Sequence, residues 1–126
     1  MDEIHFLIEK AYSRLEVARE LFENDHFEES ISRSYFAMVS AASAALQIKH
    51  LTTKTHRGLQ MRFQEEFIRS GEIEEEMGRI FRFSEDMRNR ADYQTFVNIS
   101  REQADTVLED AERFISNINA LVENIE

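Results

Sequence analysis

The chain has 126 residues, 42% of them hydrophobic and 32% charged, and a formal net charge of −10. This length and balance predict a single globular domain over residues 1–126 with a modest core. The chain has no cysteine, which excludes disulfides and thiolate metal sites. The acidic total argues against nonspecific coating of nucleic acid, and we find no DNA-binding motif.

Acidic side chains gather toward both ends of the sequence. Residues 1–30 hold nine acids and three bases, and residues 102–126 hold seven acids and one base, whereas residues 31–101 carry a slight basic excess. No basic and apolar leader is visible, and the longest uncharged run, residues 34–48, is shorter than the roughly 20 residues that cross a bilayer. We therefore expect a cytoplasmic protein without a membrane partner, in which a local arginine-lined site is possible.

Helical patterns cover most of the chain, which has no proline and only three glycines. Apolar residues at helical spacing predict five helices. We expect them over residues 2–23, 26–50, 56–70 and 73–91, and from residue 100 to the end, with a loop over 92–99. The second is apolar on most sides, which predicts a central helix. The fold class is therefore all-α, an antiparallel up-and-down bundle of four to five helices.

Two helix starts carry capping signals. Thr55 precedes the third predicted helix, and threonine is a good N-cap. Ser100 precedes the fifth and has Gln103 three residues further on, which is the capping-box pattern.

The segment Arg88-Asn89-Arg90-Ala91-Asp92-Tyr93 is the strongest candidate for a site. Guanidinium groups suit phosphate because their fork bonds two oxygens at once, so Arg88 and Arg90 are candidate anion ligands. Asp92 is expected to orient an arginine, and Tyr93 to stack on or hydrogen-bond a ligand. The alternative is that the arginines pair with Glu85, Asp86 and the acidic last helix, and that Tyr93 is a core residue with a bonded hydroxyl.

Two further groups of residues are candidates. His56 opens the third predicted helix, and imidazole can donate or accept a proton near neutral pH. Arg33 is the only charged residue between Glu29 and Lys49, and Ser30 and Ser34 are expected to share its helix face. The alternatives are a packing or capping role for His56 and a solvent-facing or Glu29-paired Arg33.

The sequence predicts no metal and no cofactor. It has no glycine-rich phosphate loop, and its four histidines are too scattered to form a metal pattern.

Three motifs together resemble the HEPN family of small helical-bundle proteins. They are Ser34-Tyr35-Phe36-Ala37 in a helix rich in small residues, Thr55-His56-Arg57-Gly58-Leu59 at the next helix start, and Arg90-Ala91-Asp92-Tyr93 after the fourth helix. Their order and spacing fit the family over about residues 5–122.

The resemblance implies a helical bundle that is usually a homodimer. Many HEPN proteins are metal-independent ribonucleases with an arginine followed four to six residues later by histidine. This chain lacks that histidine, because Asp92, Tyr93 and Gln94 occupy those positions after Arg88. Other members act beside minimal nucleotidyltransferases, a role that needs a binding surface and no catalytic histidine.

Three hypotheses follow. The first is a HEPN-like dimer that binds nucleotide or RNA phosphate and works with a nucleotidyltransferase partner, in a toxin–antitoxin-type pair. The second is a ribonuclease with a rearranged site, whose catalytic candidates are Arg90, His56 and Asp92. The third is a protein–protein interaction module with no small ligand.

Overall fold

The structure is a computed structural model that describes residues 2–94 and 98–125, and every regular element within these ranges is helical. This confirms the all-α prediction. The elements are α1 (Asp2–Glu23), α2 (Phe27–Ile48), α3 (His56–Phe63), the π-helical segment η1 (Gln64–Ile68), α4 (Glu75–Tyr93) and α5 (Arg101–Asn124).

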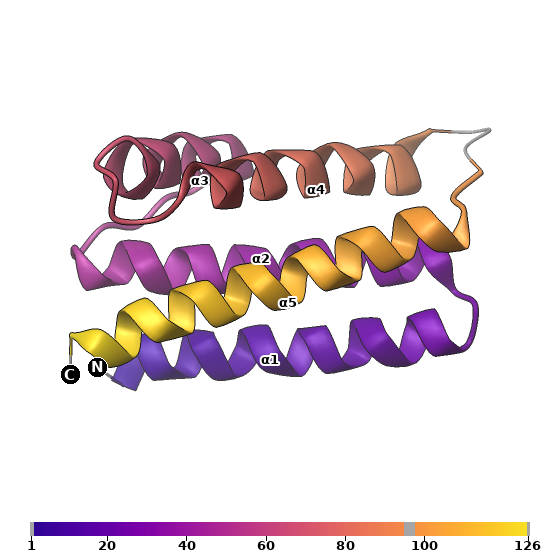
Figure 1. The fold of residues 1–126 in the computed structure, drawn as a ribbon, viewed down its shortest axis with the longest axis horizontal. Helices are drawn as coiled ribbons and strands as arrows, with labels where there is room; N and C mark the ends of the chain where they lie inside the picture. The colour runs from indigo at the N-terminus through magenta and orange to yellow at the C-terminus, as the bar shows by residue number, and fades with distance from the viewer. Residues whose placement is uncertain (1, 95–97, 126) are drawn as a thin grey trace.

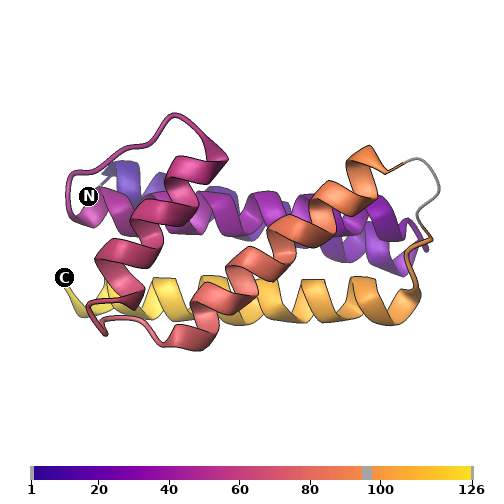
Figure 2. The same ribbon diagram turned by 90° about the horizontal axis from the view of Figure 1, so that it is seen from above.

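The helices form a bundle crossed by an upper layer. Helices α1, α2 and α5 run lengthwise, while α3, η1 and α4 lie across α2 and α5 (Figures 1 and 2). Neighbours in sequence run antiparallel, as α1 with α2 and α4 with α5 (Figure 1). Helix α2 contacts α1, α3, α4 and α5, so it is the central helix that its all-round apolar pattern predicts.

Small side chains on α2 let its neighbours approach closely. Those that are fully buried include Ala37, Ala41, Ala42, Ala44 and Ala45. Above them, large rings fill the space between the layers. We call Phe63, Phe67, Phe81 and Phe114 the phenylalanine core; the Phe81 and Phe114 ring centroids lie 4.9 Å apart. Burying one such ring stabilises a fold by about 1.5–3 kcal/mol, so this group links α5 firmly to the upper layer.

Both predicted helix caps are confirmed. The Gln103 backbone N–H donates to Ser100 Oγ over 3.1 Å, and the Ser100 N–H donates to Gln103 Oε1 over 2.9 Å, which completes the capping box. The Gly58 N–H donates to Thr55 Oγ1 over 2.9 Å at the start of α3.

The third predicted helix is not uniformly α-helical. From Gln64 to Ile68 it widens into a π-helical turn, in which the Arg69 N–H donates to the Gln64 carbonyl over 2.8 Å. Phe67 and Ile68, although adjacent in sequence, are both buried there. Helix α4 passes closely over this turn at Gly78, where a Cβ would lie 2.9 Å from Gln64 Oε1.

The prediction that a loop begins at Asp92 is wrong by two residues. Helix α4 continues through Tyr93, so Asp92 and Tyr93 lie in its last turn. The extension brings Asp92 one turn after Arg88, where opposite charges stabilise a helix. Residues 95–97 of the predicted loop lie outside the described residues.

No helix in the described part of the chain is both long and apolar enough to cross a membrane.

Candidate functional site

The Arg88 side chain lies among aromatic rings where α4 passes over α2. Its guanidinium carbon is 4.9 Å from the Phe36 ring centroid, 5.2 Å from that of Tyr93 and 5.9 Å from that of Tyr35. Only 14% of the side chain is exposed. Cations bind favourably to aromatic faces, and more strongly when water is excluded. Arg88 is therefore a positive charge held in a fixed and nearly buried position.

Asp92 ties this arginine to α2. Arg88 Nε lies 3.0 Å from Asp92 Oδ2, close enough for an ion pair, although the N–H is not aimed well enough to form a hydrogen bond. The Ser32 hydroxyl donates to the same carboxylate oxygen over 3.2 Å. Asp92 thus links α4 to α2 and fixes Arg88 from one side. For Asp92 to orient an arginine, as we predict, its carboxylate must lie beside a guanidinium, and it lies beside that of Arg88.

Tyr35 closes the inner side of the site. Its hydroxyl donates to Glu85 Oε2 over 3.2 Å, and its ring is fully buried against Phe81. Burial raises the pKa of Tyr35, and the negative charge of Glu85 raises that pKa further. The phenol therefore stays protonated at neutral pH and serves as a neutral hydrogen-bond donor.

His56 contacts the same rings from α3. Its ring centroid is 5.6 Å from that of Tyr35 and 5.6 Å from that of Phe36, edge to face in both cases. His56 and Arg88, 32 positions apart in sequence, thus share the ring pair Tyr35–Phe36. We call Arg88, Asp92, Tyr93, Tyr35, Phe36 and His56 the Arg88 cluster.

Arg90 does not join the Arg88 cluster. A two-residue step turns a helix by about 200°, so Arg90 leaves α4 on the side opposite Arg88. Its Nη1 lies 3.7 Å from the Met87 sulfur. Met87 belongs to a second, smaller core group with Ile31, Ala91 and Ile99. The two arginines of the candidate segment therefore face different surroundings.

The residues predicted to share a face of α2 are separated. Ser30 and Ser34 are fully buried, and the Ser30 hydroxyl donates to the Ala18 carbonyl over 2.8 Å. Ser34 Oγ has no partner among the described residues. Arg33, by contrast, is exposed and lines a hollow beside the Arg88 cluster, so burial separates residues that the helical spacing makes neighbours. Arg33 and Ser34 are adjacent, so they point about 100° apart around α2, and Arg33 is turned toward solvent.

Sequence reasoning missed Arg14 and Ser32, and it did not count Phe36 as a site residue. Arg14 on α1 reaches α2, where its Nη1 donates to Ser40 Oγ over 2.8 Å. Its spacing on α1 gives no sign of this contact, because nothing local distinguishes an arginine facing a neighbouring helix from one facing solvent. Phe36 follows Tyr35 in the motif Ser34-Tyr35-Phe36-Ala37, and this adjacency is the only indication of its role in the sequence.

The fold and this site define a class: a small helical bundle with a cationic, aromatic-lined site where its fourth helix crosses the central one. The HEPN domain model matches residues 4–121. The chain therefore belongs to the HEPN family, and the resemblance seen in the motifs is confirmed.

Several relatives match over most of their length. The "Putative toxin MJ0605" of Methanocaldococcus jannaschii is 36% identical over 98% of this chain and 92% of that protein. The "Putative toxin MJ0142" of the same organism is 30% identical over 90% of this chain and 78% of its own. A "UPF0332 protein" of Thermotoga maritima is 27% identical over 98% of this chain and 93% of its own.

Proposed function

We propose that this chain is the HEPN protein of a toxin–antitoxin-type pair and that it binds the phosphate of a nucleotide or RNA at the Arg88 cluster. In this proposal it is a cytoplasmic homodimer and acts beside a minimal nucleotidyltransferase. The observation that carries the ligand assignment is the position of Arg88, a guanidinium that is 14% exposed, stacked on aromatic rings and fixed by Asp92.

A phosphate ester fits the chemistry of this cluster. A guanidinium fork bonds phosphate oxygens in pairs, and fixing it in advance lowers the entropy lost on binding. Tyr93 stands beside Arg88 with 70% of its surface exposed, so its ring is available to stack on a base. Stacking of a base on an aromatic ring is worth about 1–3 kcal/mol and needs no particular base. A charged fork with an open ring beside it favours nucleotide or single-stranded RNA over a simple anion.

The toxin–antitoxin assignment rests on the relatives. Two relatives that cover most of this chain carry toxin in their names. The partner follows from the family resemblance, since the HEPN histidine is replaced by Asp92 or Tyr93 in register. A member without that histidine retains a binding surface, which suits a protein that works with an enzyme partner.

The test is binding of a fluorescein-labelled single-stranded RNA, and separately of ATP, to the wild type and to Arg88→Met. Methionine keeps much of the side-chain volume and removes the charge. Arg113→Met is the matched control. Arg113 on α5 pairs with Glu76 of α4, and Glu76 lies about three helical turns before Arg88, away from the Arg88 cluster. We expect Arg88→Met to weaken binding at least about tenfold, the equivalent of one charged hydrogen bond. Equal affinity of Arg88→Met and wild type would refute the ligand site.

A metal-independent ribonuclease is the second candidate, and the ring pair shared by His56 and Arg88 favours it. In such a reaction the imidazole would take the proton of a 2′-hydroxyl, and the 2′-oxygen would attack the adjacent phosphorus. The P–O5′ bond would break and the 5′-oxygen would take a proton from water, while the guanidinium would stabilise charge on the phosphate. The protein would be incubated with RNA in EDTA beside His56→Ala and Arg88→Met. Cleavage abolished by both substitutions supports this candidate, and uncut RNA in the wild-type sample excludes it.

A further inference from the structure

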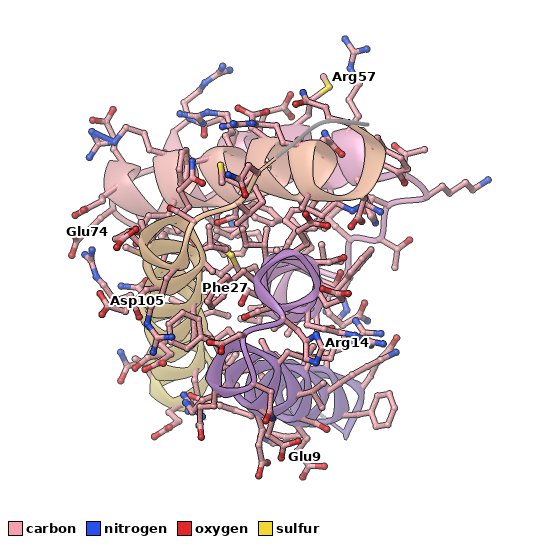
Figure 3. All side chains as sticks on the ribbon, turned by 90° about the vertical axis from the view of Figure 1, so that its right-hand side faces the viewer. Glu9, Arg14, Phe27, Arg57, Glu74 and Asp105 are labelled. Atoms are coloured by element: carbon pink, nitrogen blue, oxygen red, sulfur yellow. The ribbon has the colours of Figure 1, made fainter. Side chains whose placement is uncertain are left out.

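A hollow of about 340 Å³ lies beside the Arg88 cluster, lined by Arg14, Ser32, Arg33 and Phe36. It lies between α1 and α2 on the side of α2 that faces away from α5. Figure 3 shows Arg14 on that side, across α2 from Asp105 on α5. No helix of the described chain covers it, so a ligand can approach from solvent.

The Arg14 guanidinium is anchored at the base of this hollow. Its Nη1 donates to Ser40 Oγ over 2.8 Å and to the Phe36 carbonyl over 3.3 Å. No described residue accepts a hydrogen bond from its other nitrogens. Burial lowers the pKa of Arg14, and the charge of Arg33 lowers that pKa further. Two positive charges thus face one hollow, and an anion bound between them would offset their repulsion.

No carboxylate among the described residues forms an ion pair with Arg14 or Arg33. Other arginines of this acidic chain do have such partners: Arg19 pairs with Glu112, Arg88 with Asp92, Arg101 with Asp25 and Arg113 with Glu76. What distinguishes Arg14 and Arg33 from the other arginines without an ion pair is that they line one hollow beside the Arg88 cluster and that the charge of Arg33 acts on Arg14. An external anion bound in the hollow would supply the counter-charge that both arginines lack among the described residues.

The hollow continues into the Arg88 cluster through two shared residues. Phe36 lines the hollow, and Arg88 stacks on its ring at 4.9 Å. Ser32 also lines the hollow and donates to Asp92, the partner of Arg88. Arg88 and the two arginines of the hollow therefore border the same ring and the same serine hydroxyl.

We propose that Arg14 and Arg33 form a second phosphate subsite, so that the protein takes a ligand with two or more phosphate groups. This inference rests on the proposed function for its ligand class and adds to it a subsite on α1 and α2. Consecutive phosphodiesters of single-stranded RNA supply such groups, and so does the polyphosphate of a nucleoside triphosphate. A phosphate monoester with a single charge centre fills only one of the two positions.

The experiment measures the salt dependence of RNA binding by fluorescence anisotropy. A labelled single-stranded RNA of about 12 nucleotides, within the usual site sizes of single-strand binders, is titrated with wild type, Arg14→Gln, Arg33→Gln and Arg113→Gln. Arg14→Gln keeps a polar side chain at a part-buried position and Arg33 is exposed, so we expect both variants to fold, and circular dichroism verifies this. Arg113→Gln removes the same charge from the α4–α5 side.

We expect Arg33→Gln and Arg14→Gln each to weaken RNA binding about tenfold at low salt, and Arg113→Gln to change it little. Each lost phosphate contact should also reduce the slope of log K against log salt by about 0.7. A second titration with ATP shows which ligand supplies the phosphates. Loss of ATP affinity in Arg33→Gln identifies the polyphosphate of a nucleotide, and loss of RNA affinity alone identifies a single-stranded RNA. Both results support a phosphate subsite.

Failure of the subsite can be distinguished from failure of the proposed function. If Arg88→Met loses affinity while Arg14→Gln and Arg33→Gln keep wild-type affinity and slope, the subsite is refuted and the function stands. If only the Arg14 and Arg33 variants lose affinity, the subsite stands and the Arg88 assignment fails. If polyglutamate of equal charge displaces the RNA from the wild type as well as unlabelled RNA does, the hollow takes acidic protein segments and the subsite is refuted.

Discussion

Two groups of aromatic rings meet at α4, and they differ in what surrounds them. The phenylalanine core is fully buried. Its rings come from α3, η1, α4 and α5, and the Phe63 and Phe81 ring centroids are 5.5 Å apart. The Arg88 cluster has rings at similar separations, with Tyr35 and Phe36 5.7 Å apart. It adds a guanidinium, an imidazole and a carboxylate, and it is open to solvent at Tyr93. Similar ring geometry therefore serves cohesion in one group and, we propose, recognition in the other.

Tyr35 lies at the border of the two groups. Its ring stacks on Phe81 of the core at 5.9 Å and meets Phe36 and His56 of the cluster. Rigid packing on one side thus holds the polar groups on the other side in position. Each substitution below should affect mainly stability or mainly binding, according to the group that it alters.

The largest expected effect is on stability, from Phe81→Ala in the phenylalanine core. Removing this ring leaves a cavity beside Phe63 and Phe114, which should lower the free energy of unfolding by about 3–5 kcal/mol. Urea denaturation measures the change. Phe83→Ala, on the same helix but 44% exposed, is the control and should cost less than about 0.5 kcal/mol. Equal losses in the two variants would remove the distinction between core and surface rings.

Arg88→Met should change stability little and RNA affinity strongly, the reverse of Phe81→Ala. The substitution removes one partner of an ion pair, but Asp92 is 30% exposed and keeps the hydrogen bond from Ser32, so the free energy of unfolding should fall by only about 1 kcal/mol. RNA affinity should fall at least about tenfold. Denaturation and anisotropy on the same preparation measure both quantities. A variant destabilised like Phe81→Ala that still binds RNA normally would make Arg88 a structural residue.

Tyr35→Phe tests the border residue. Loss of the hydrogen bond to Glu85 should cost about 1 kcal/mol at neutral pH. The pKa of Tyr35 is raised above its ordinary value of 10.0 by burial and by Glu85, so the folded state keeps a proton that the unfolded state loses. The wild type should therefore lose stability as pH rises above 10, and the variant should lose less. Parallel pH profiles from thermal unfolding would contradict the buried, protonated phenol.

Asp110→Asn, outside both aromatic groups, should have the smallest effect. Burial on α5 raises the pKa of Asp110, so its charge destabilises the folded state at neutral pH. The amide should stabilise the fold by less than about 1 kcal/mol, because solvent screens this half-buried group. The gain should disappear as pH falls below the ordinary value of 3.8, where the carboxyl is protonated in both states. Glu102→Gln, exposed on the same helix, serves as the control in thermal unfolding.

Local signals predicted the scaffold well. Helical spacing placed α1 and α2 within two residues of their ends, and the capping box at Ser100 fixed the start of α5. These features depend on interactions within one helix or one turn, which sequence spacing encodes directly. The π-helical turn at residues 64–68 escaped prediction because it depends on how Phe67 and Ile68 pack against other helices.

The site could be predicted only in part. Arg88, Asp92 and His56 were chosen for their chemistry, and the structure brings them around one ring pair. Their convergence with Arg14 and Ser32 needs four separate helices in register, which no local pattern contains. The predicted end of α4 at Ala91 also hid the one-turn spacing between Arg88 and Asp92. That Arg88 and Arg90 are anion ligands stays a prediction.

The most direct test of the central claim is to observe the Arg88 side chain while RNA binds. At 14.9 kDa the protein suits NMR, and the Nε–Hε signal of Arg88 in a ¹⁵N-labelled sample can be assigned by comparison with Arg88→Met. On titration with short single-stranded RNA, we expect the Arg88 signal to shift and saturate along the binding curve while that of Arg113 stays in place. RNA binding that leaves the Arg88 signal unmoved would contradict the account.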